Sequence, residues 1–458
     1  MKFVYKPYQS SDTIAAIATP PGEGGVAIIR ISGTDAIEIA EKVFSGPVRK
    51  YVSHTAHLGK IIDLHGKTVD EGLILPMKAP RSYTGEDIVE IHCHGGNLLA
   101  KLVLQTVIKA GARAALPGEF SFRAFQNGKL DLAQAEAVQE VIASRNELAL
   151  KAAEKQLEGA LSKHIQTFQK ELTDIAAILE AWVDFPEEGL EFASIDEVVQ
   201  ILETVLCKMQ KMEQTFEEGK ILREGISLCL AGSPNVGKSS LLNALLGKNR
   251  AIVTDIPGTT RDLLEENMLL GNLHFRITDT AGIRETEEIV EQEGIKRSKI
   301  AMQDADIVLL VFDAERGASE EDKALLSSCN LSKTILIWNK IDLPSPKITD
   351  FSTPYCVSLS AKHLIGFDEL RSNIEKILWE KGPPSQEEVI LTNTRHREAL
   401  LNAIESCDAL IQGIKTGISP EFLSSDMRNT LKELGTIIGT DITEDILSAI
   451  FSKFCVGK

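Results

Sequence analysis

Aromatic residues and long hydrophobic runs are both scarce in this sequence. Of its 458 residues, 5% are Phe, Trp or Tyr, 43% are hydrophobic and 25% are charged. No apolar run is long enough for a membrane-spanning helix, which needs roughly 18 residues or more. The hydrophobic share is also too high for a disordered chain. At roughly 150 residues per domain, the length predicts about three globular domains.

Paired cysteines and a secretory signal are missing as well. The seven cysteines contain no Cys-x-x-Cys pair, and their number is odd. After Lys2 and Lys6, the apolar stretch is broken by Ser10, Ser11 and Asp12, so no signal-peptide core forms. Scattered cysteines of odd number in such a chain are typical of reduced thiols. We therefore expect a cytoplasmic protein with no membrane partner.

Basic residues do not outnumber acidic ones. Lys and Arg total 49 and Asp and Glu total 66, which gives a net charge of -17. A protein that coats nucleic acid irrespective of its sequence needs a basic surface, so the charge excludes that class. It leaves open a nucleic acid bound by a local basic patch or through a partner protein.

The N-terminal part of the chain has the pattern of short strands. Residues 1 to about 120 are rich in Gly and Pro and contain short apolar runs such as Val26–Ile31 and Glu71–Pro76. Runs of this length between turn residues predict strands, with a helix or two between them. We expect an α+β module here.

The next hundred residues have the pattern of helices. From Leu130 to about Arg223, apolar residues recur every three or four positions, with charges between them and few glycines. One break is expected, where Pro186 and Gly189 end a helix. Ser194 or Asp196 is then expected to cap the following helix.

Residues 225 to about 380 alternate strand-like runs with amphipathic helices, which predicts a mostly parallel, doubly wound sheet. The predicted strands are Ile226–Ala231, His274–Thr278, Asp306–Phe312, Thr334–Trp338 and Tyr355–Leu359. After the linker signal Lys381–Pro384, helical periodicity returns and continues to Phe454. We expect the two helical stretches to pack together, with the α/β segment inserted between them.

A phosphate-binding loop follows the first of these strands. Gly232-Ser-Pro-Asn-Val-Gly-Lys-Ser239 precedes an amphipathic helix that starts at Ser240. The glycines let backbone N–H groups close on phosphate oxygens, and a helix N-terminus favours anions. Lys238 is placed to neutralise the outer phosphates, and the Ser239 hydroxyl is placed to ligate Mg²⁺. The alternative, a glycine turn with a solvated lysine, is disfavoured by the strand-loop-helix order.

A guanine-recognition segment follows the fourth strand. In Asn339-Lys-Ile-Asp342, a carboxylate accepts both N–H donors of the guanine Watson–Crick edge, and Asn339 supports the acceptor side of the ring. Adenine lacks that donor pair and would leave the Asp342 charge unpaired. Alone, such a tetrapeptide is more often an ordinary turn. Here it lies between a phosphate loop and Ser360-Ala-Lys362, which favours GTP.

Between these segments, Asp279-Thr-Ala-Gly282 follows the second strand. Asp279 is placed to hold the Mg²⁺ shell through water, and Gly282 is placed to offer its N–H to the γ-phosphate. Ras-like proteins then supply a Gln that orients the attacking water, but Ile283 and Arg284 follow here. Together the motifs resemble a translation-factor-type GTPase domain with a Ras-like, small G-protein fold. Without the Gln, another element must contribute to hydrolysis.

A monovalent cation is one such element. The side-chain oxygen of Asn235 and the backbone carbonyls of Thr254, Ile256 and Thr259 are expected to surround K⁺ against the phosphates. Thr260 would complete the Mg²⁺ shell. This segment resembles those of potassium-activated GTPases that dimerise across their nucleotide faces. The alternative is a plain switch loop with an ordinary polar Asn.

Segments outside the GTPase domain resemble the MnmE (TrmE) family of tRNA uridine-modifying GTPases, and the resemblance covers essentially the whole chain. They are Ala18–Gly33, Tyr83–Gly96, Pro117–Glu136 and Phe454–Lys458. One departure is Val456, where the family usually has Ile. His92-Cys-His94 has metal-ligand composition, but adjacent residues on a strand point apart, which disfavours a metal site.

The resemblance implies a folate-binding-like N-terminal domain that takes 5-formyltetrahydrofolate as its one-carbon source. Arg30, Glu90, Lys129 and the C-terminal Lys458 would contact it, the alternative being surface ion pairs. It also implies that the second switch supplies Glu291, an acid that helps orient water, although a solvated helix face is an alternative there. For Cys455, a role in the modification and a packed small side chain both remain open.

The resemblance further implies an enzyme that works as a homodimer with the FAD-dependent partner MnmG (GidA). It would install a carboxymethylaminomethyl or aminomethyl group on C5 of the wobble uridine of certain tRNAs, with GTP hydrolysis driving conformational change. A ribosome-assembly GTPase is the alternative, but it would be expected to add a basic KH-type domain, and no such segment follows residue 380. A membrane-remodelling GTPase would need a basic amphipathic helix, which is not evident.

These inferences predict four segments and one set of nucleotide ligands. The segments are 1–120, an N-terminal folate-binding-like and dimerisation domain; 121–222, the first part of a discontinuous helical domain; 223–380, the GTPase domain; and 381–458, the second helical part. The candidate GTP-binding residues are Asn235, Val236, Gly237, Lys238, Ser239, Ser240, Thr254, Asp255, Ile256, Pro257, Gly258, Thr259, Thr260, Asp279, Thr280, Ala281, Gly282, Asn339, Lys340, Asp342, Ser360, Ala361 and Lys362.

Overall fold

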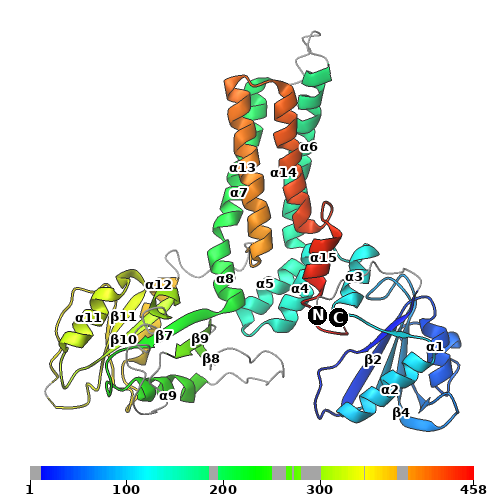
Figure 1. Ribbon diagram of the computed structural model, residues 1–458, viewed down its shortest axis with the longest axis horizontal. Helices are drawn as coiled ribbons and strands as arrows, with labels where there is room; N and C mark the ends of the chain where they lie inside the picture. Colours follow the sequence, from blue (N-terminus) through cyan, green and yellow to red (C-terminus); the bar gives the residue numbers. More distant parts are fainter. Residues whose placement is uncertain are drawn as a thin grey trace. The chain divides into compact units, whose positions relative to one another are not determined.

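The chain divides into two compact units, and neither is continuous in sequence (Figure 1). The first comprises Met1–Ala143, Ala153–Lys211 and Arg395–Lys458, and the second comprises Ser144–Ala152 and Met212–Thr394. This computed structural model describes residues 12–184, 194–249, 265–270, 273–279, 301–344, 346–378 and 390–457. Within those ranges, no helix combines the length and the apolar character needed to cross a membrane.

A six-stranded sheet forms the N-terminal part of the first unit. Its strand order is β3-β4-β5-β2-β1-β6, antiparallel throughout except for the parallel pair β1 and β6. The elements are β1 (Ile14–Ile17), β2 (Val26–Ser32), α1 (Ala36–Val43), the 3-10 helix η1 (Val48–Lys50), β3 (His57–Ile62), β4 (Thr68–Met77), β5 (Ile88–His94), α2 (Asn97–Lys109) and β6 (Arg113–Ala114). The expected α+β module is confirmed.

Strand β2 places alternate side chains on two faces of the sheet. Ala27, Ile29 and Ile31 are buried in one core with residues of α1 and α2. Arg30 alternates with them and therefore points to the other face, because successive side chains of a strand alternate. The register places it opposite Glu90 of β5. The apolar run that predicts β2 thus also brings Arg30 and Glu90 together.

Helices form the rest of the first unit and confirm the packing of the two helical stretches. α6 packs against α14, and Lys415 of α13 donates to Glu203 of α7 at 2.7 Å. The helices are α3 (Glu119–Gln126), α4 (Leu132–Ala143), α5 (Glu147–Leu157), α6 (Ala160–Asp184), α7 (Ile195–Gln214), α13 (Thr394–Thr416), α14 (Pro420–Ile438) and α15 (Glu444–Phe451). Two of these helices cross into the second unit, α5 with its residues up to Ala152 and α7 with its residues from Met212 on.

The prediction of one break in the first helical stretch is wrong. The chain also breaks between α4 and α5, between α5 and α6, and after α7. Gly159, with φ of 83°, separates α5 from α6 in a left-handed conformation that glycine adopts without strain. The expected cap of α7 is Ser194 rather than Asp196: Ser194 and Glu197 bond each other's backbone N–H groups at 3.3 and 3.1 Å.

The second unit contains the predicted doubly wound sheet, in the order β12-β11-β10-β7-β9-β8. All pairs are parallel except β8 with β9, and the sequence did not predict β8. Its elements are α8 (Phe216–Glu224), β7 (Ile226–Ala231), α9 (Lys238–Asn249), β8 (Glu265–Leu270), β9 (Leu273–Asp279), β10 (Ile307–Asp313), α11 (Glu320–Ser328), the 3-10 helix η2 (Leu331–Lys333), β11 (Thr334–Asn339), β12 (Cys356–Ser358) and α12 (Phe367–Leu378).

The sheet of the second unit is covered on both faces. One core includes residues of α9 and α12, and the other includes Leu325 and Leu326 of α11. β10 and β11 are buried along their full length and β7 is buried except at Ser227, as the near-continuous apolar runs predict. Their carboxyl ends share one edge, where doubly wound sheets bind ligands.

Candidate functional site

The loop between β7 and α9 has the strained geometry of a phosphate-binding loop. Gly232 and Gly237 have φ of 144° and 98°, and Asn235 is left-handed at 64°. A Cβ at Gly232 would collide with the carbonyl oxygen of Val311 on β10, so only glycine fits. Lys238 Nζ donates to the carbonyls of Gly232 and Ser233 at 2.7 and 2.9 Å. The lysine is therefore already folded over the loop.

Two residues at the end of β11 hold the second half of this loop. Asn339 Nδ2 donates to the carbonyl of Val236 at 3.0 Å, and Asn339 Oδ1 accepts from the N–H of Ala361 at 3.0 Å. Lys340 Nζ donates to the carbonyl of Asn235 at 2.8 Å and to Asp313 Oδ2 at 2.7 Å. The phosphate loop and the predicted guanine-recognition segment are thus one connected structure.

Asp342 lies in the same cluster as an ionised carboxylate. Ser360 Oγ donates to its Oδ1 at 2.6 Å, and this bond holds the pKa of Asp342 below its usual value. His363 Nε2 lies 3.6 Å from Oδ2. Asp313 also has a lowered pKa: burial acts to raise it, but the hydrogen bonds from Lys340 and two backbone N–H groups prevail. The carboxyl edge of the sheet thus presents the Asp342 carboxylate, which can accept hydrogen bonds, beside the phosphate loop that carries Lys238.

The structure places only part of the predicted nucleotide site. Ser239 and Ser240 are exposed in the first turn of α9, and Lys362 is exposed beside Ala361. The end of β9 at Asp279 pairs with Leu230 of β7, which brings it next to the loop. The predictions for Thr254, Asp255, Ile256, Pro257, Gly258, Thr259, Thr260, Thr280, Ala281, Gly282, Glu291 and Lys458 fall outside the described residues.

A second polar site lies on the face of the N-terminal sheet to which Arg30 points. Arg30 Nε donates to Glu90 Oε1 at 2.9 Å, and Arg30 Nη1 donates to the carbonyl of Gly457 at 3.2 Å. The guanidinium carbon is 5.7 Å from the ring centroids of both Tyr83 and Phe120, within cation–π range. The structure therefore brings the C-terminal segment to the predicted Arg30–Glu90 pair.

Lys129, which follows α3, contacts the loop that carries Tyr83. Its Nζ donates to the carbonyl of Pro80 at 3.2 Å, and its side chain is near Gly85. Asn127 donates to the carbonyl of Thr84 at 2.7 Å and so fixes the same loop. Of the four predicted folate ligands, Arg30, Glu90 and Lys129 lie within the described residues, and Arg30 and Glu90 form an ion pair.

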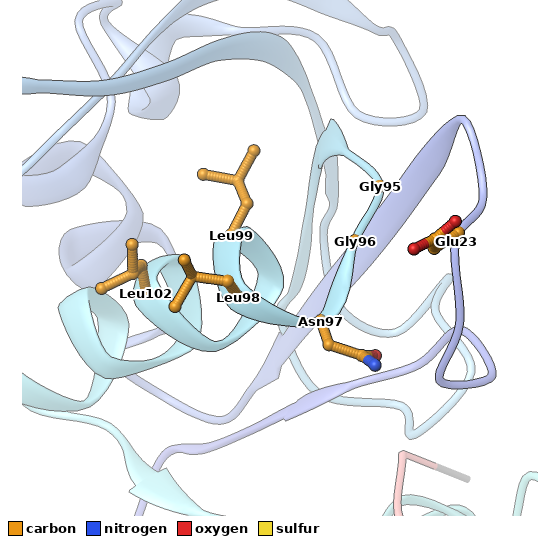
Figure 2. A pocket seen from close by; sticks show the side chains of 7 residues that line it. All are labelled: Glu23, Gly95, Gly96, Asn97, Leu98, Leu99 and Leu102. Atoms are coloured by element: carbon orange, nitrogen blue, oxygen red, sulfur yellow. The ribbon is translucent and has the colours of Figure 1, made fainter.

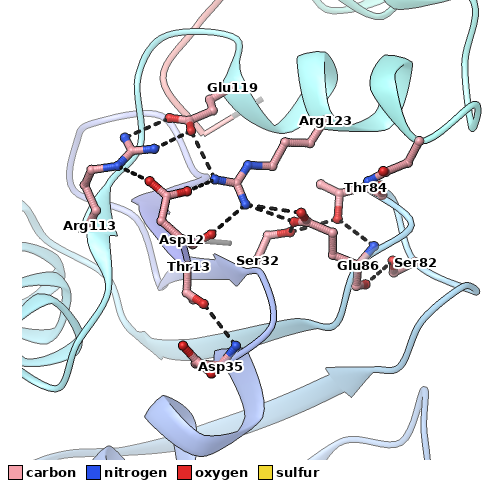
Figure 3. Close-up of polar contacts among 11 residues, drawn as sticks. Asp12, Thr13, Ser32, Asp35, Ser82, Thr84, Glu86, Arg113, Glu119 and Arg123 are labelled. Carbon is pink, nitrogen blue, oxygen red and sulfur yellow. Dashed lines mark hydrogen bonds and ion pairs between the residues drawn. The ribbon is translucent and has the colours of Figure 1, made fainter. Parts of the chain in front are cut away.

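Sequence reasoning missed a buried charge network under this site (Figure 3). Arg123, 4% exposed, contacts Asp12 at 2.6 Å, Glu86 at 3.1 Å and the fully buried Glu119 at 3.2 Å. Arg113 bonds both Asp12 and Glu119. Burial acts to raise the pKa of Asp12, but the two arginines lower it. The one local signal is the i, i+4 spacing of Glu119 and Arg123, which says nothing of the partners far away in sequence.

A pocket of about 410 Å³ opens at the N-terminus of α2 (Figure 2) and contains none of the predicted site residues. Its lining is Glu23, Gly95, Gly96, Asn97, Leu98, Leu99 and Leu102. Gly22 N donates to Asn97 Oδ1 at 3.1 Å, which ties the loop before β2 to this helix end.

Known proteins match this chain over its whole length. Residues 13–129 match the family described as GTP-binding protein TrmE N-terminus, and residues 132–455 match the MnmE helical domain. The protein named tRNA modification GTPase MnmE from Protochlamydia amoebophila (strain UWE25) is 60% identical over 458 residues, 100% of both chains. The chain belongs to the MnmE family. As a member of this GTPase family, it is an enzyme that hydrolyses GTP.

Other proteins match the chain at lower identity. The tRNA modification GTPase MnmE of Chlamydia caviae is 45% identical over 448 residues, 98% of this chain and 99% of that one. Among solved structures, the G domain of the T. maritima FeoB iron transporter is 28% identical, covering 33% of this chain and 98% of that chain, with a TM-score of 0.25.

Proposed function

We propose that this protein is a GTP-hydrolysing tRNA modification enzyme that adds a carboxymethylaminomethyl or aminomethyl group at C5 of the wobble uridine in certain tRNAs. It would take the one-carbon unit from 5-formyltetrahydrofolate and act in the cytoplasm with the FAD-dependent partner MnmG (GidA). The observation that carries the proposal is the coexistence, in one chain of this family, of a phosphate loop joined to Asp342 and an Arg30–Glu90 site.

GTP would lie along the carboxyl edge of the second sheet. The backbone N–H groups of the loop and the N-terminus of α9 bind phosphate, and Lys238 neutralises it. Asp342 would accept both guanine donors, and the hydrogen bond from Ser360 lowers the pKa of its carboxyl group. Mg²⁺ fits the exposed hydroxyl of Ser239, with Thr260 as the second proposed ligand; when bound, it neutralises charge on the phosphates.

For the folate, the Arg30–Glu90 pair offers both signs of charge on a surface flanked by aromatic rings. Glu90 suits the N–H face of the pterin ring, and Arg30 and Lys129 suit the anionic glutamate tail of the folate. The pair is largely buried, with side chains 15% and 11% exposed, so a ligand there gains strength from partial exclusion of water. Lys458 is the fourth proposed ligand. We also propose a homodimer, as part of the family resemblance.

The test of this function is nucleoside mass spectrometry of tRNA from a strain that lacks the protein. The proposal predicts that C5-modified wobble uridine disappears from some tRNAs and returns when the wild-type chain is supplied. A chain with Arg30→Ala should fail to restore it, while GTP hydrolysis persists, because the two sites are separate. Unchanged wobble uridine in the deletion strain would refute the proposal.

We also propose that K⁺ compensates for the Gln that is absent from the second switch. Asn235 is exposed in the loop, and its carbonyl is already bonded to Lys340, which leaves the side-chain oxygen as the group offered to the cation. Thr254, Ile256 and Thr259 would supply carbonyls, and Glu291 would help orient water.

This reading predicts faster GTP turnover in K⁺ than in Na⁺ at equal ionic strength. A bound K⁺ places positive charge where other GTPases place an arginine, an effect worth orders of magnitude in rate. Steady-state phosphate release in the two salts measures it, and Asn235→Ala should remove the difference. Equal wild-type rates in both salts would contradict a cation ligand at Asn235.

A further inference from the structure

The first half of the phosphate loop is tied to a helix that contains none of the predicted nucleotide ligands. Ser233 follows Gly232 and is 3% exposed. Its Oγ donates to Oδ1 of Asp322, which is 1% exposed and belongs to the first turn of α11. The two residues are 89 positions apart in sequence. Loop and helix are thus joined by a buried, charge-assisted hydrogen bond.

The helix end holds the Asp322 carboxylate in a fixed orientation. Oδ2 of Asp322 accepts from the N–H and the Oγ of Ser319 at 2.9 and 2.7 Å, and the N–H of Asp322 donates back to Ser319 Oγ at 3.2 Å. This is a complete capping box, and a negative charge there is also favoured by the helix dipole. Leu325 and Leu326 anchor the same helix to the sheet core. Asp322 is therefore a rigid acceptor.

Ser233 connects this fixed carboxylate to the phosphate loop and to its lysine. Its carbonyl accepts from Lys238 Nζ, so one residue bonds α11 through its side chain and the loop lysine through its backbone. Asn339 and Lys340 fix only the later carbonyls of the loop, at Val236 and Asn235. The bond to Asp322 is the corresponding support for the beginning of the loop.

We infer that Ser233 and Asp322 are positioning residues for nucleotide binding, which keep the beginning of the phosphate loop in its binding conformation. The inference rests on the proposed GTP site and adds two residues that do not themselves contact nucleotide. Without the bond, the loop must be ordered by the nucleotide, and the ordering cost weakens binding. Affinity should fall, while kcat at saturating GTP changes little, since the switch segments are untouched.

Binding of a fluorescent GDP analogue to the full chain tests this inference. Ser233→Ala should weaken binding by about tenfold, the effect of losing one hydrogen bond to a charged group, and Asp322→Ala by at least as much, because it also removes the helix cap. The double variant should be little weaker than Asp322→Ala, because both substitutions remove the same bond to the loop. In steady-state turnover, KM for GTP should rise in the same proportion.

Ser319→Ala is the matched control. It removes a hydroxyl bonded to the same carboxylate and part of the same cap, but it leaves the Ser233 bond intact. Its nucleotide affinity should fall much less than that of Ser233→Ala, because the carboxylate keeps its bonds to Ser233 Oγ and to the backbone N–H of Ser319. If Ser319→Ala weakens binding as much as Ser233→Ala, or if Ser233→Ala binds normally, the inference is wrong. If the wild-type chain itself does not bind the analogue, the proposed function fails instead.

Discussion

At the scale of single residues, Arg30 has the densest set of contacts in the N-terminal site. It bonds a carboxylate, a backbone carbonyl of the C-terminal segment and the faces of two aromatic rings. Only a planar guanidinium offers these donors and faces together. The carbonyl belongs to Gly457, which is buried and has φ of 97°. Arg30 therefore ties down the C-terminal segment, in which the exposed Cys455 lies two residues before Gly457.

Gly457→Ala is predicted to release the C-terminal segment. An added Cβ would lie 2.5 Å from the carbonyl oxygen of Ile17, and the left-handed backbone adds about 1 kcal/mol of strain. Hydrogen exchange of the peptide covering residues 454–457 measures the release, which should appear as lost protection. Modification of wobble uridine should fall with it.

Gly417→Ala is the control for backbone strain alone. Gly417 has φ of 72°, but an added Cβ there would meet nothing within 4 Å. It should leave exchange of residues 454–457 unchanged. Equal exchange in the wild type and Gly457→Ala would show that the contact with Arg30 does not fix the segment.

At the scale of elements, one buried carboxylate joins three helices of the first unit. Glu136 of α4 accepts from Arg395 at 3.0 and 2.6 Å and lies 2.7 Å from Nε2 of the fully buried His396, both on α13. Arg395 also donates to the carbonyls of Thr436 and Ile437 at the end of α14. Burial acts to raise the pKa of Glu136, but His396 and Arg395 lower it to about 2. The helices on either side of the inserted unit are thus joined through charge.

Acid should weaken this junction. Because the folded-state pKa of Glu136 is depressed, its contribution is complete above the unfolded value of 4.5 and is lost as pH falls towards about 2. The contribution is on the order of 3 kcal/mol. Denaturant unfolding should show Glu136→Gln less stable than the wild type at pH 7, with the difference shrinking as pH falls from 5 to 2.

The exposed Glu405 of α13 provides the comparison for Glu136. Glu405→Gln changes the same charge on the surface and should leave stability nearly unchanged at every pH. A constant difference between Glu136→Gln and the wild type across that range would contradict the assigned ion pair.

The sequence predicts strands and loops correctly where a single pattern is strong. The buried strands β7, β10 and β11 are continuous apolar runs, and the loop before α9 has fixed glycine spacing, so both were predictable. β8 was missed because its first residues are polar, and the extra helix breaks were missed because helical periodicity continues across Gly159. Helical periodicity shows which face of a helix is buried, but it does not show where one helix ends and the next begins.

At the scale of the whole molecule, the chain order predicts an inserted GTPase but not the contacts that complete its sites. The Ser233–Asp322 bond spans 89 residues, and the Arg30–Gly457 bond spans 427. Such contacts depend on the final packing of distant segments, which no local pattern records. The position of Asn339 and Asp342 beside the phosphate loop was predictable because parallel strands end at one edge of a sheet, whereas their role in guanine binding stays a prediction.

Nucleotide selectivity of Asp342→Asn is the most direct test of the central claim, that this edge binds GTP through Asp342. An amide at this position keeps one acceptor and replaces the other by a donor, which matches xanthine instead of guanine. Competition binding to the full chain should show GTP affinity lowered roughly a hundredfold and XTP affinity raised. GTP binding by Asp342→Asn equal to that of the wild type would contradict the account.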